Sequence, residues 1–459
     1  MLKMKSNKII VLLTIMLLIL NFVVYTVSIT FDFPVGDHWR LLNKNLIPYL
    51  TGNISFFKFL IGDFTTSGGS GILTLLFEYV NYTIFSLRYE LETYIGIVFY
   101  LLTFLIICIN YTNKYGGKKL NWQTGFFIIT ASLVWFGLDK AHPWGLVGFE
   151  RVYLLMGVAF LILTERYLTG KTGLKMYLAA ICILSFLGGA LGTLSVIVGI
   201  IFVAFYVSIK KKRICLDVIF ILIISFICQL IIYSLKDGSS QPSRLSSEMV
   251  INQLLDYKEL SAYFVGALSQ PLFDPLYNFS YGNTLVLSII VMLFTLSVFV
   301  ISGCILLKNR AHEWTIMPTL LIMYSLVSMI SITFLRLPLL GFKATLASRY
   351  TAIYEICFVG CLLALAQGFS GTKIQSKIFL AIIFSFVLVF SSTTTFTKWK
   401  DVDNVIEHKE KWRAQLIGYA LDKSVKMEVF DFSCLYKKKN NCEDCIDFLY
   451  TNRLSLFTE

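Results

Sequence analysis

The chain has 459 residues, of which 56% are hydrophobic and only 15% are charged, and its formal net charge is +12. Soluble proteins average about 25% charged residues, so the composition excludes an ordinary soluble enzyme and favours a polytopic protein in a lipid bilayer. The positive charge does not indicate a nucleic-acid partner, because the Lys and Arg residues gather in short connections between apolar segments, where they orient a membrane protein.

The first apolar segment, residues 9–31, carries no charge and is long enough to cross the hydrocarbon core of a bilayer as a helix. Lys3, Lys5 and Lys8 precede it, which predicts a cytoplasmic N-terminus. No small-residue cleavage site follows the segment. We therefore interpret it as a retained anchor and not as a signal peptide.

Further segments with little or no charge follow the first one. They lie at 93–113, 120–138, 146–164, 176–209, 218–235, 285–307, 314–335, 350–369 and 378–397. Residues 176–209 are too many for one typical helix and contain Gly188 and Gly189 at their middle, which predicts two helices joined by a tight turn. This division brings the total to about eleven spans and keeps the later Lys and Arg clusters in the cytoplasm.

The regions between and after the spans complete the predicted architecture. Within the polar region 32–92, residues 71–87 are mostly apolar but interrupted by Glu78, which predicts a helix lying in the outer interface. We expect an all-α polytopic protein, with a transmembrane domain over 1–397 and a small polar extracytoplasmic tail over 398–459.

A short polar stretch places Asp37, His38 and Arg40 where the chain leaves the first span. A carboxylate there can act as a general base towards an acceptor hydroxyl, or help to hold a divalent cation against a phosphate. Alternatively, Asp37 and His38 begin the next helix and Trp39 lies among the lipid headgroups. Asp63 is a similar candidate, with a solvated loop acid as its alternative.

A second group of candidates is cationic. The predicted outer loop from Arg336 to Tyr350 carries Arg336, Lys343 and Arg349 but no acid. Such cations suit a phosphate or pyrophosphate group near the outer leaflet. The alternative is that Arg336 and Arg349 extend from helix ends towards the headgroups.

Three further observations concern ligands and intramembrane charge. Lys140 and Trp144 are candidates for lining a sugar site, although Trp144 also fits the aromatic belt of a membrane protein. Arg151 and Glu355 lie at or inside spans, where charge indicates either function or an internal ion pair. The sequence has no phosphate-binding glycine loop and no metal-ligand spacing of histidines, so it predicts no cofactor and leaves only a divalent cation as an open alternative.

The order of these features resembles the GT-C superfamily of polytopic glycosyltransferases, and in particular bacterial membrane glucosyl transferases of the O-antigen-modifying kind. The shared motifs are Asp37-His38-Trp39 after the first span, a Trp-Gly segment at Trp144, Ser348-Arg349-Tyr350 at the start of a late span, and an ending like that at 452–457. One motif departs from the pattern: many relatives carry Asn-Glu-His-Arg before the interfacial helix, whereas here residues 65–70 read Thr-Thr-Ser-Gly-Gly-Ser.

The resemblance implies an enzyme of the bacterial cytoplasmic (inner) membrane that takes a sugar from a polyprenyl-phosphate donor. The sugar would move to a hydroxyl of a cell-surface glycan or glycolipid. Asp37 would be the base, helped by His38, and Arg349 with Lys343 or Arg40 would stabilise the departing phosphate. The remaining substrate-binding candidates are Asp63, Lys140, Trp144 and Tyr350.

Two other functions compete with transfer. A flippase or transporter of lipid-linked saccharide would show internal symmetry and charged or broken helices at the bilayer midplane. An O-antigen polymerase would use the larger loop 236–284, where Arg244, Asp256 and Asp274 lie. The sequence contains no internal repeat and its charges gather at the outer ends of spans, which favours the transferase.

Overall fold

The structure is a computed structural model. It describes residues 2–35, 37–62, 72–115, 122–138, 141, 149, 151–211, 216–234, 247–273, 284–310, 312–335, 337–338, 348–369, 374–424 and 440–457. Every regular element within these ranges is a helix. The predicted all-α class is therefore confirmed.

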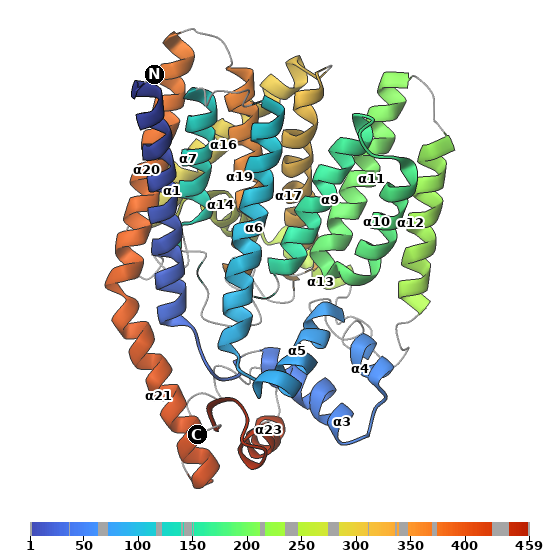
Figure 1. Ribbon diagram of the computed structural model, residues 1–459, viewed down its shortest axis with the longest axis vertical. Coiled ribbons are helices and arrows are strands. Elements are labelled where there is room, and N and C mark those ends of the chain that lie inside the picture. Colours follow the sequence, from blue (N-terminus) through green and yellow to red (C-terminus); the bar gives the residue numbers. More distant parts are fainter. Residues whose placement is uncertain are drawn as a thin grey trace.

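Among the described residues, seven helices are long and apolar enough to cross a membrane. They are α1 (Leu2–Ile29), α6 (Glu90–Tyr115), α11 (Gly189–Lys211), α16 (Thr284–Lys308), α17 (Ile316–Leu335), α19 (Ser348–Gly368) and α20 (Ile374–Lys400). These helices form one bundle in which the helix axes are roughly parallel or antiparallel to one another (Figure 1). The chain is thus a multi-pass membrane protein.

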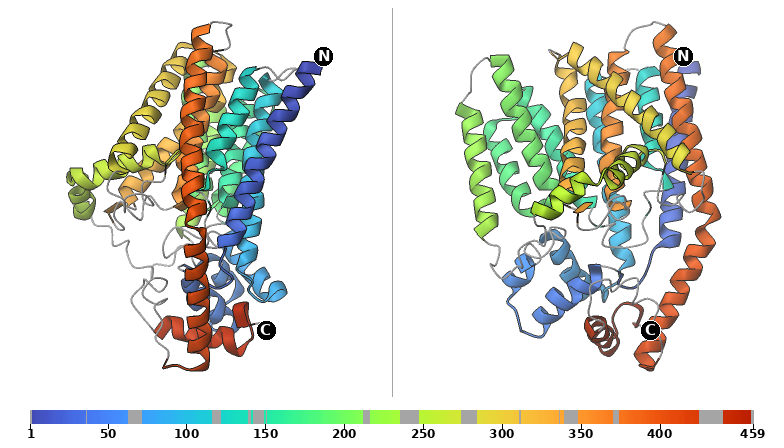
Figure 2. Two further views of the ribbon diagram at one scale, coloured as in Figure 1. Left: turned by 90° about the vertical axis from the view of Figure 1, so that its left-hand side faces the viewer. Right: turned by 180° about the vertical axis from the view of Figure 1, so that it is seen from behind.

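Four helices of 14 to 19 residues lie in the same bundle (Figures 1 and 2). They are α7 (Trp122–Trp135), α9 (Arg151–Leu168), α10 (Leu174–Leu187) and α12 (Leu216–Ser234). The predicted division of segment 176–209 is confirmed, because α10 ends at Leu187 and α11 begins at Gly189. Gly189 has φ +55°, a left-handed conformation that glycine adopts without strain.

Glycine also permits the close packing of α9 against α11. A Cβ atom built on Gly199 of α11 would lie 2.7 Å from the ring of Phe160 and 2.9 Å from the hydroxyl of Thr164, both on α9. Small residues of this kind let helix backbones approach one another inside a membrane. This contact holds α9, which begins at Arg151, in a defined place in the bundle.

A smaller group of short helices lies beyond one end of the bundle, the end opposite to the start of α1 (Figure 1). We call it the lobe. It contains α2 (Asp37–Leu41), the π-helix η1 (Leu42–Leu46), α3 (Ile47–Leu50), α4 (Phe56–Gly62), α5 (Ile72–Phe85), α23 (Asn440–Thr451) and the 3-10 turn η5 (Ser455–Phe457). Helix α5 occupies the segment for which an interfacial helix was expected, and its residues Ile84 and Phe85 expose apolar side chains.

The C-terminal residues are part of the lobe. Helix α21 (Val402–Leu421) continues the line of α20 out of the bundle and reaches the lobe, so the boundary predicted between residues 397 and 398 falls inside α20 (Figure 1). Cys445, Ile446 and Leu449 of α23 share one buried cluster with residues that follow the first span, among them Trp39. The first polar region and the tail therefore share a single hydrophobic core.

The region 236–284, on which the polymerase alternative depends, contains α13 (Ser247–Leu255) and α14 (Tyr257–Ser269). Asp256 lies between these helices and accepts backbone hydrogen bonds from Lys258 at 3.1 Å and from Glu259 at 3.2 Å. A side chain used in this way caps a helix N-terminus. Arg244 and Asp274 lie outside the described residues.

Candidate functional site

The polar stretch after the first span forms α2, which begins at Asp37. This matches the expectation that Asp37 and His38 begin a helix, and an acid at the first position is favourable to the helix dipole. Trp39 does not lie among lipid headgroups, as the alternative reading had it, because only 4% of its surface is exposed and it packs in the lobe core. Of Asp37 and Arg40 the structure describes the backbone alone.

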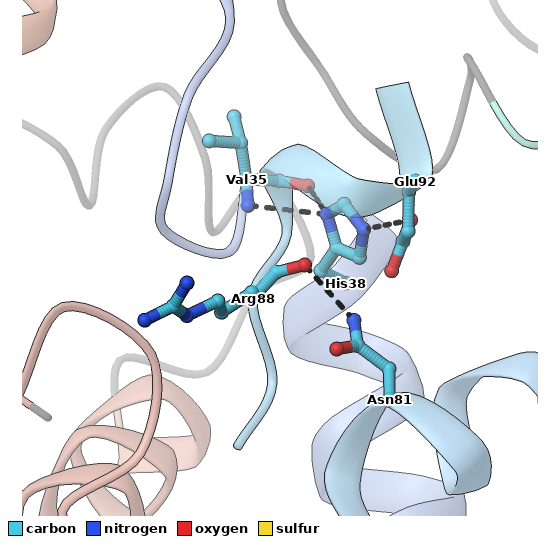
Figure 3. A network of polar contacts seen from close by, with 5 residues as sticks. All are labelled: Val35, His38, Asn81, Arg88 and Glu92. Atoms are coloured by element: carbon cyan, nitrogen blue, oxygen red, sulfur yellow. Dashed lines mark hydrogen bonds and ion pairs between the residues drawn. The ribbon is translucent and has the colours of Figure 1, made fainter. Parts of the chain in front are cut away.

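His38 points into the interior and is 1% exposed (Figure 3). Its Nε2 lies 2.8 Å from Oε2 of Glu92, in the first turn of α6, and its Nδ1 lies 3.1 Å from the carbonyl oxygen of Val35. The ring also packs edge-on against Tyr89, with 4.5 Å between the ring centroids. His38 thus connects the exit segment, α2 and the start of a membrane-spanning helix.

The number of protons on the His38–Glu92 pair depends on the tautomer of His38. Its Nδ1 lies 3.1 Å from the Val35 carbonyl oxygen, to which it could donate, and 3.4 Å from the Val35 backbone N–H, from which it could accept. In the tautomer that donates to the carbonyl oxygen, one further proton between Nε2 and Oε2 leaves the pair without net charge, which favours its burial.

Glu78 and Tyr89 complete a buried acid–base cluster with His38 and Glu92, and each of the four is at most 1% exposed. Burial raises the pKa of Glu78 well above its ordinary value of 4.5, and the nearby Glu92 carboxyl raises it further, while His38 lowers it. Burial, and then Glu78, likewise raise the pKa of Tyr89. The cluster therefore keeps Glu78 in its protonated, neutral form well above pH 4.5.

The protonation of Glu78 has a consequence for stability. Its pKa is higher in the folded protein than in the unfolded chain, so between the two values the folded protein binds more protons and stability falls as pH rises. We expect the unfolding temperature in detergent to fall as pH rises above about 4.5, and Glu78→Gln to remove part of that fall. Glu90→Gln, at a partly exposed acid of the same region, is the control and should keep it. An unchanged pH dependence in Glu78→Gln would contradict the assignment.

The turn between α5 and α6, which carries Tyr89, is held in an unusual conformation. Ser86 and Leu87 have φ of 55° and 58°, a region that side chains other than glycine rarely adopt. Asn81 Nδ2 donates to the carbonyl oxygen of Arg88 at 3.1 Å (Figure 3), and the backbone N–H of Ser455 donates to Ser86 at 2.7 Å. Strained backbone persists where surrounding contacts hold it, and here the C-terminal segment supplies one of them.

The same C-terminal segment is tied to the end of the first span. Ser455 Oγ donates to the carbonyl oxygen of Asp32 at 2.9 Å, and Arg413 of α21 lies 3.4 Å from the carboxylate of Asp32. Helix α23 also packs directly on α2 and η1. The lobe therefore surrounds the His38–Glu92 pair with contacts from both ends of the chain.

A second polar cluster lies within the bundle. Tyr100 Oη of α6 is 2.7 Å from Glu355 Oε2 of α19 and 2.8 Å from the carbonyl oxygen of Trp135, the last residue of α7. The Arg151 guanidinium lies over the Tyr100 ring, 4.5 Å from its centroid, and interacts electrostatically with Glu355. Arg151 and Glu355 thus belong to one cluster around Tyr100, and a direct ion pair between them stays a prediction.

The two clusters lie at the same end of the bundle. Glu92 and Tyr100 are eight residues apart on α6, a rise of about 12 Å along the helix. Arg151 is the first residue of α9, and Glu355 lies two turns after the start of α19. Helices α6, α9 and α19 therefore all begin at the end of the bundle that faces the lobe.

Of the remaining site residues predicted from the sequence, some are described by their backbone alone and others lie outside the described residues. Arg349 and Tyr350 belong to the first turn of α19, at the lobe end of the bundle, with their backbone alone described. Four candidates and one motif lie outside the described residues, namely Asp63, Lys140, Trp144, Lys343 and the segment 65–70. The structure thus places His38 and the backbone of the Ser348–Tyr350 turn at the same end of the bundle.

Sequence reasoning missed Glu92 and Tyr89. Glu92 stands one residue before the apolar segment 93–113, where an acid reads as an ordinary helix start. Glu78 was visible as a charge that interrupts an apolar helix, and this signal pointed to a buried partner without naming it. Within the described ranges, no group of three or more His, Cys, Asp or Glu side chains is arranged to hold a metal ion.

The chain was compared with known proteins at the levels of family, sequence and structure. No family model, no curated protein and no solved structure matches it.

Proposed function

We propose that this protein is a membrane glycosyltransferase that moves a sugar from a polyprenyl-phosphate donor to a hydroxyl of a cell-surface glycan or glycolipid. It would be of the GT-C type, with the O-antigen-modifying enzymes of the bacterial inner membrane as the nearest kind. The observation that carries the proposal is that α2 contacts the first turn of α6, and that α6, α9 and α19 all begin at the end of the bundle that faces the lobe. A donor with its lipid in the bilayer and its phosphate at the surface would reach this end.

The proposal includes a topology of eleven spans. Helices α7, α9, α10 and α12 would cross the membrane beside the seven longer ones, with local thinning of the bilayer making up for their shorter length. The N-terminus would then be cytoplasmic, and the lobe and the C-terminus extracytoplasmic. The position of the lobe at the end of the bundle opposite to the start of α1 supports this orientation (Figure 1).

The proposed reaction follows from the chemistry of the predicted residues. Asp37 removes the proton from the acceptor hydroxyl, whose oxygen attacks the anomeric carbon of the donor sugar. The bond between that carbon and the phosphate oxygen breaks, and polyprenyl phosphate leaves. Arg349, Lys343 and Arg40 offer cations that would stabilise the charge on this leaving group.

The other predicted residues would bind the substrates or position the catalytic groups. The substrate-binding residues would be Asp63, Lys140, Trp144 and Tyr350. A divalent cation beside Asp37 remains an alternative means of holding the phosphate. His38 would act through α2 and not on the substrate, because its ring is buried and both of its nitrogens face protein groups.

The direct test is a transfer assay with the purified protein in proteoliposomes. The donors are polyprenyl-phosphate glucose, galactose and mannose, the acceptor is an O-antigen glycolipid, and the release of polyprenyl phosphate is measured by mass spectrometry. We expect release with at least one donor that depends on the acceptor. Movement of the intact donor between leaflets would instead support the flippase. Absence of release with all three donors would contradict the transferase.

The polymerase alternative is less well supported by the loop on which it depends. Asp256 is engaged as a helix cap through two backbone hydrogen bonds. A carboxylate committed to capping is a poorer candidate for catalysis than one at an exit from the membrane. Loss of transfer on substitution of Arg244 or Asp256, with Asp37 dispensable, would nevertheless favour the polymerase.

A further inference from the structure

Helix α2 is too short to determine its own orientation. It continues without a break into η1 and α3, and even this combined stretch, residues 37–50, falls in the range of about 12–15 residues at which an isolated helix is marginal in water. Its placement therefore depends on contacts with the rest of the protein. One of these comes from α23, where the thiol of Cys445 lies 3.8 Å from the carbonyl oxygen of Trp39, a long and weak contact.

A short buried hydrogen bond joins His38 of α2 to Glu92 of α6. It is 2.8 Å long and both side chains are 1% exposed, so water does not compete for it. Glu92 belongs to the first turn of α6, whose apolar remainder is anchored in the bundle through Tyr100 and its contacts with Trp135 and Glu355. The pair thus joins the start of the short helical stretch 37–50 to a helix that is anchored in the bundle.

We propose that Glu92 is a positioning residue: through His38 it sets the place of α2, and with it the backbone of Asp37, in the transferase site. This inference rests on the proposed function for its catalytic part and not for its structural part. Asp37 directly precedes His38 in the chain and belongs to the same helical turn. A shift of His38 must therefore move Asp37.

The polar groups around Glu92 support its role as a residue that positions α2. Glu78 faces it from α5, Tyr89 approaches from the α5–α6 turn, and His38 comes from α2, while Cys445 of α23 lies near Tyr89. Each element of the lobe that packs here therefore contributes a polar group. Because Glu78 is neutral, the carboxyl of Glu92 can share a proton with His38 without a second negative charge beside it.

The experiment compares Glu92→Leu, Glu92→Gln and the control Glu90→Leu, which changes a partly exposed acid in the same turn of α6. Leu removes the partner of His38, whereas the amide of Gln still offers it a hydrogen bond. The first readout is hydrogen exchange of the backbone amides of 38–46 in nanodiscs. The second is kcat and KM for the polyprenyl-phosphate sugar that the wild type uses.

In Glu92→Leu we expect the α2 amides to exchange at least about tenfold faster, with α17 and α19 unchanged, because only the local contact is lost. The value of kcat should fall about tenfold or more, with KM for the donor within about threefold of the wild type, since the donor contacts remain. Glu92→Gln and Glu90→Leu should stay close to the wild type in both readouts.

Unchanged exchange of α2 in Glu92→Leu, or an equal effect of Glu90→Leu, would overturn the proposal. If Glu92→Leu also loses protection in α17, it has failed to fold, and His38→Leu becomes the test with the same expected results. A wild type that transfers no sugar overturns the proposed function alone, because the exchange measurement still decides whether Glu92 holds α2.

Discussion

Asp37→Asn is expected to abolish sugar transfer, with a loss of about 100-fold to 10,000-fold, the usual contribution of a general base. Asn has nearly the size of Asp and is equally acceptable at a helix start, so α2 should still form. Its amide cannot take the proton of the acceptor hydroxyl. The measurement is the rate of polyprenyl phosphate release in proteoliposomes, at matched amounts of inserted protein.

The matched control for this substitution is Asp444→Asn, which changes an exposed acid on α23 of the same lobe and should leave the rate unchanged. Insertion and folding of both variants are compared by their unfolding temperatures. Full transfer by Asp37→Asn would remove Asp37 as the base. An equal loss in both variants would mean that the lobe as a whole, and not this carboxylate, is needed.

Glu355→Leu is expected to destabilise the bundle by about 3–5 kcal/mol, the typical cost of leaving a charge in the interior without its opposite charge, because Glu355 is fully buried and interacts electrostatically with Arg151. The substitution removes the negative charge that acts on the Arg151 guanidinium and takes from Tyr100 Oη an acceptor at 2.7 Å. The measurement is the free energy or temperature of unfolding in detergent. The effect should be much larger than that of Glu90→Leu, at a partly exposed acid of α6.

A second substitution tests the cause of that loss. If the uncompensated charge is responsible, Arg151→Met combined with Glu355→Leu should recover most of the stability, because a buried pair can often be replaced by apolar residues at little cost. A double variant as unstable as Glu355→Leu alone would contradict this account. It would assign the loss to the packing around Tyr100 instead.

Several features of the fold were predictable because they depend on short stretches of sequence. The apolar segment 9–31 forms the membrane-crossing part of α1, and the pair Gly188-Gly189 separates α10 from α11. Length, hydropathy and the backbone freedom of glycine suffice for both. The helix predicted over 71–87 is likewise present as α5, because its apolar pattern is local.

The candidate site was predictable only in part. The exit from the first span directed attention to His38, and unusual charges within apolar segments directed it to Glu78, Arg151 and Glu355. The sequence did not say which charges would meet. Glu92 escaped notice because an acid at the start of a helix is common and needs no special reason.

Hydropathy and residue spacing by themselves determined that this chain is an all-α membrane protein, where several of its helices begin, and which charges needed partners. Only the tertiary structure decided the partners: His38 with Glu92, 54 residues away, Tyr100 with Glu355, 255 away, and Ser455 with Asp32, 423 away. Hydropathy reports how strongly a segment prefers the bilayer and carries no information about its neighbours. Those neighbours follow from how the helices pack, through contacts such as Gly199 against α9 that depend on the whole bundle.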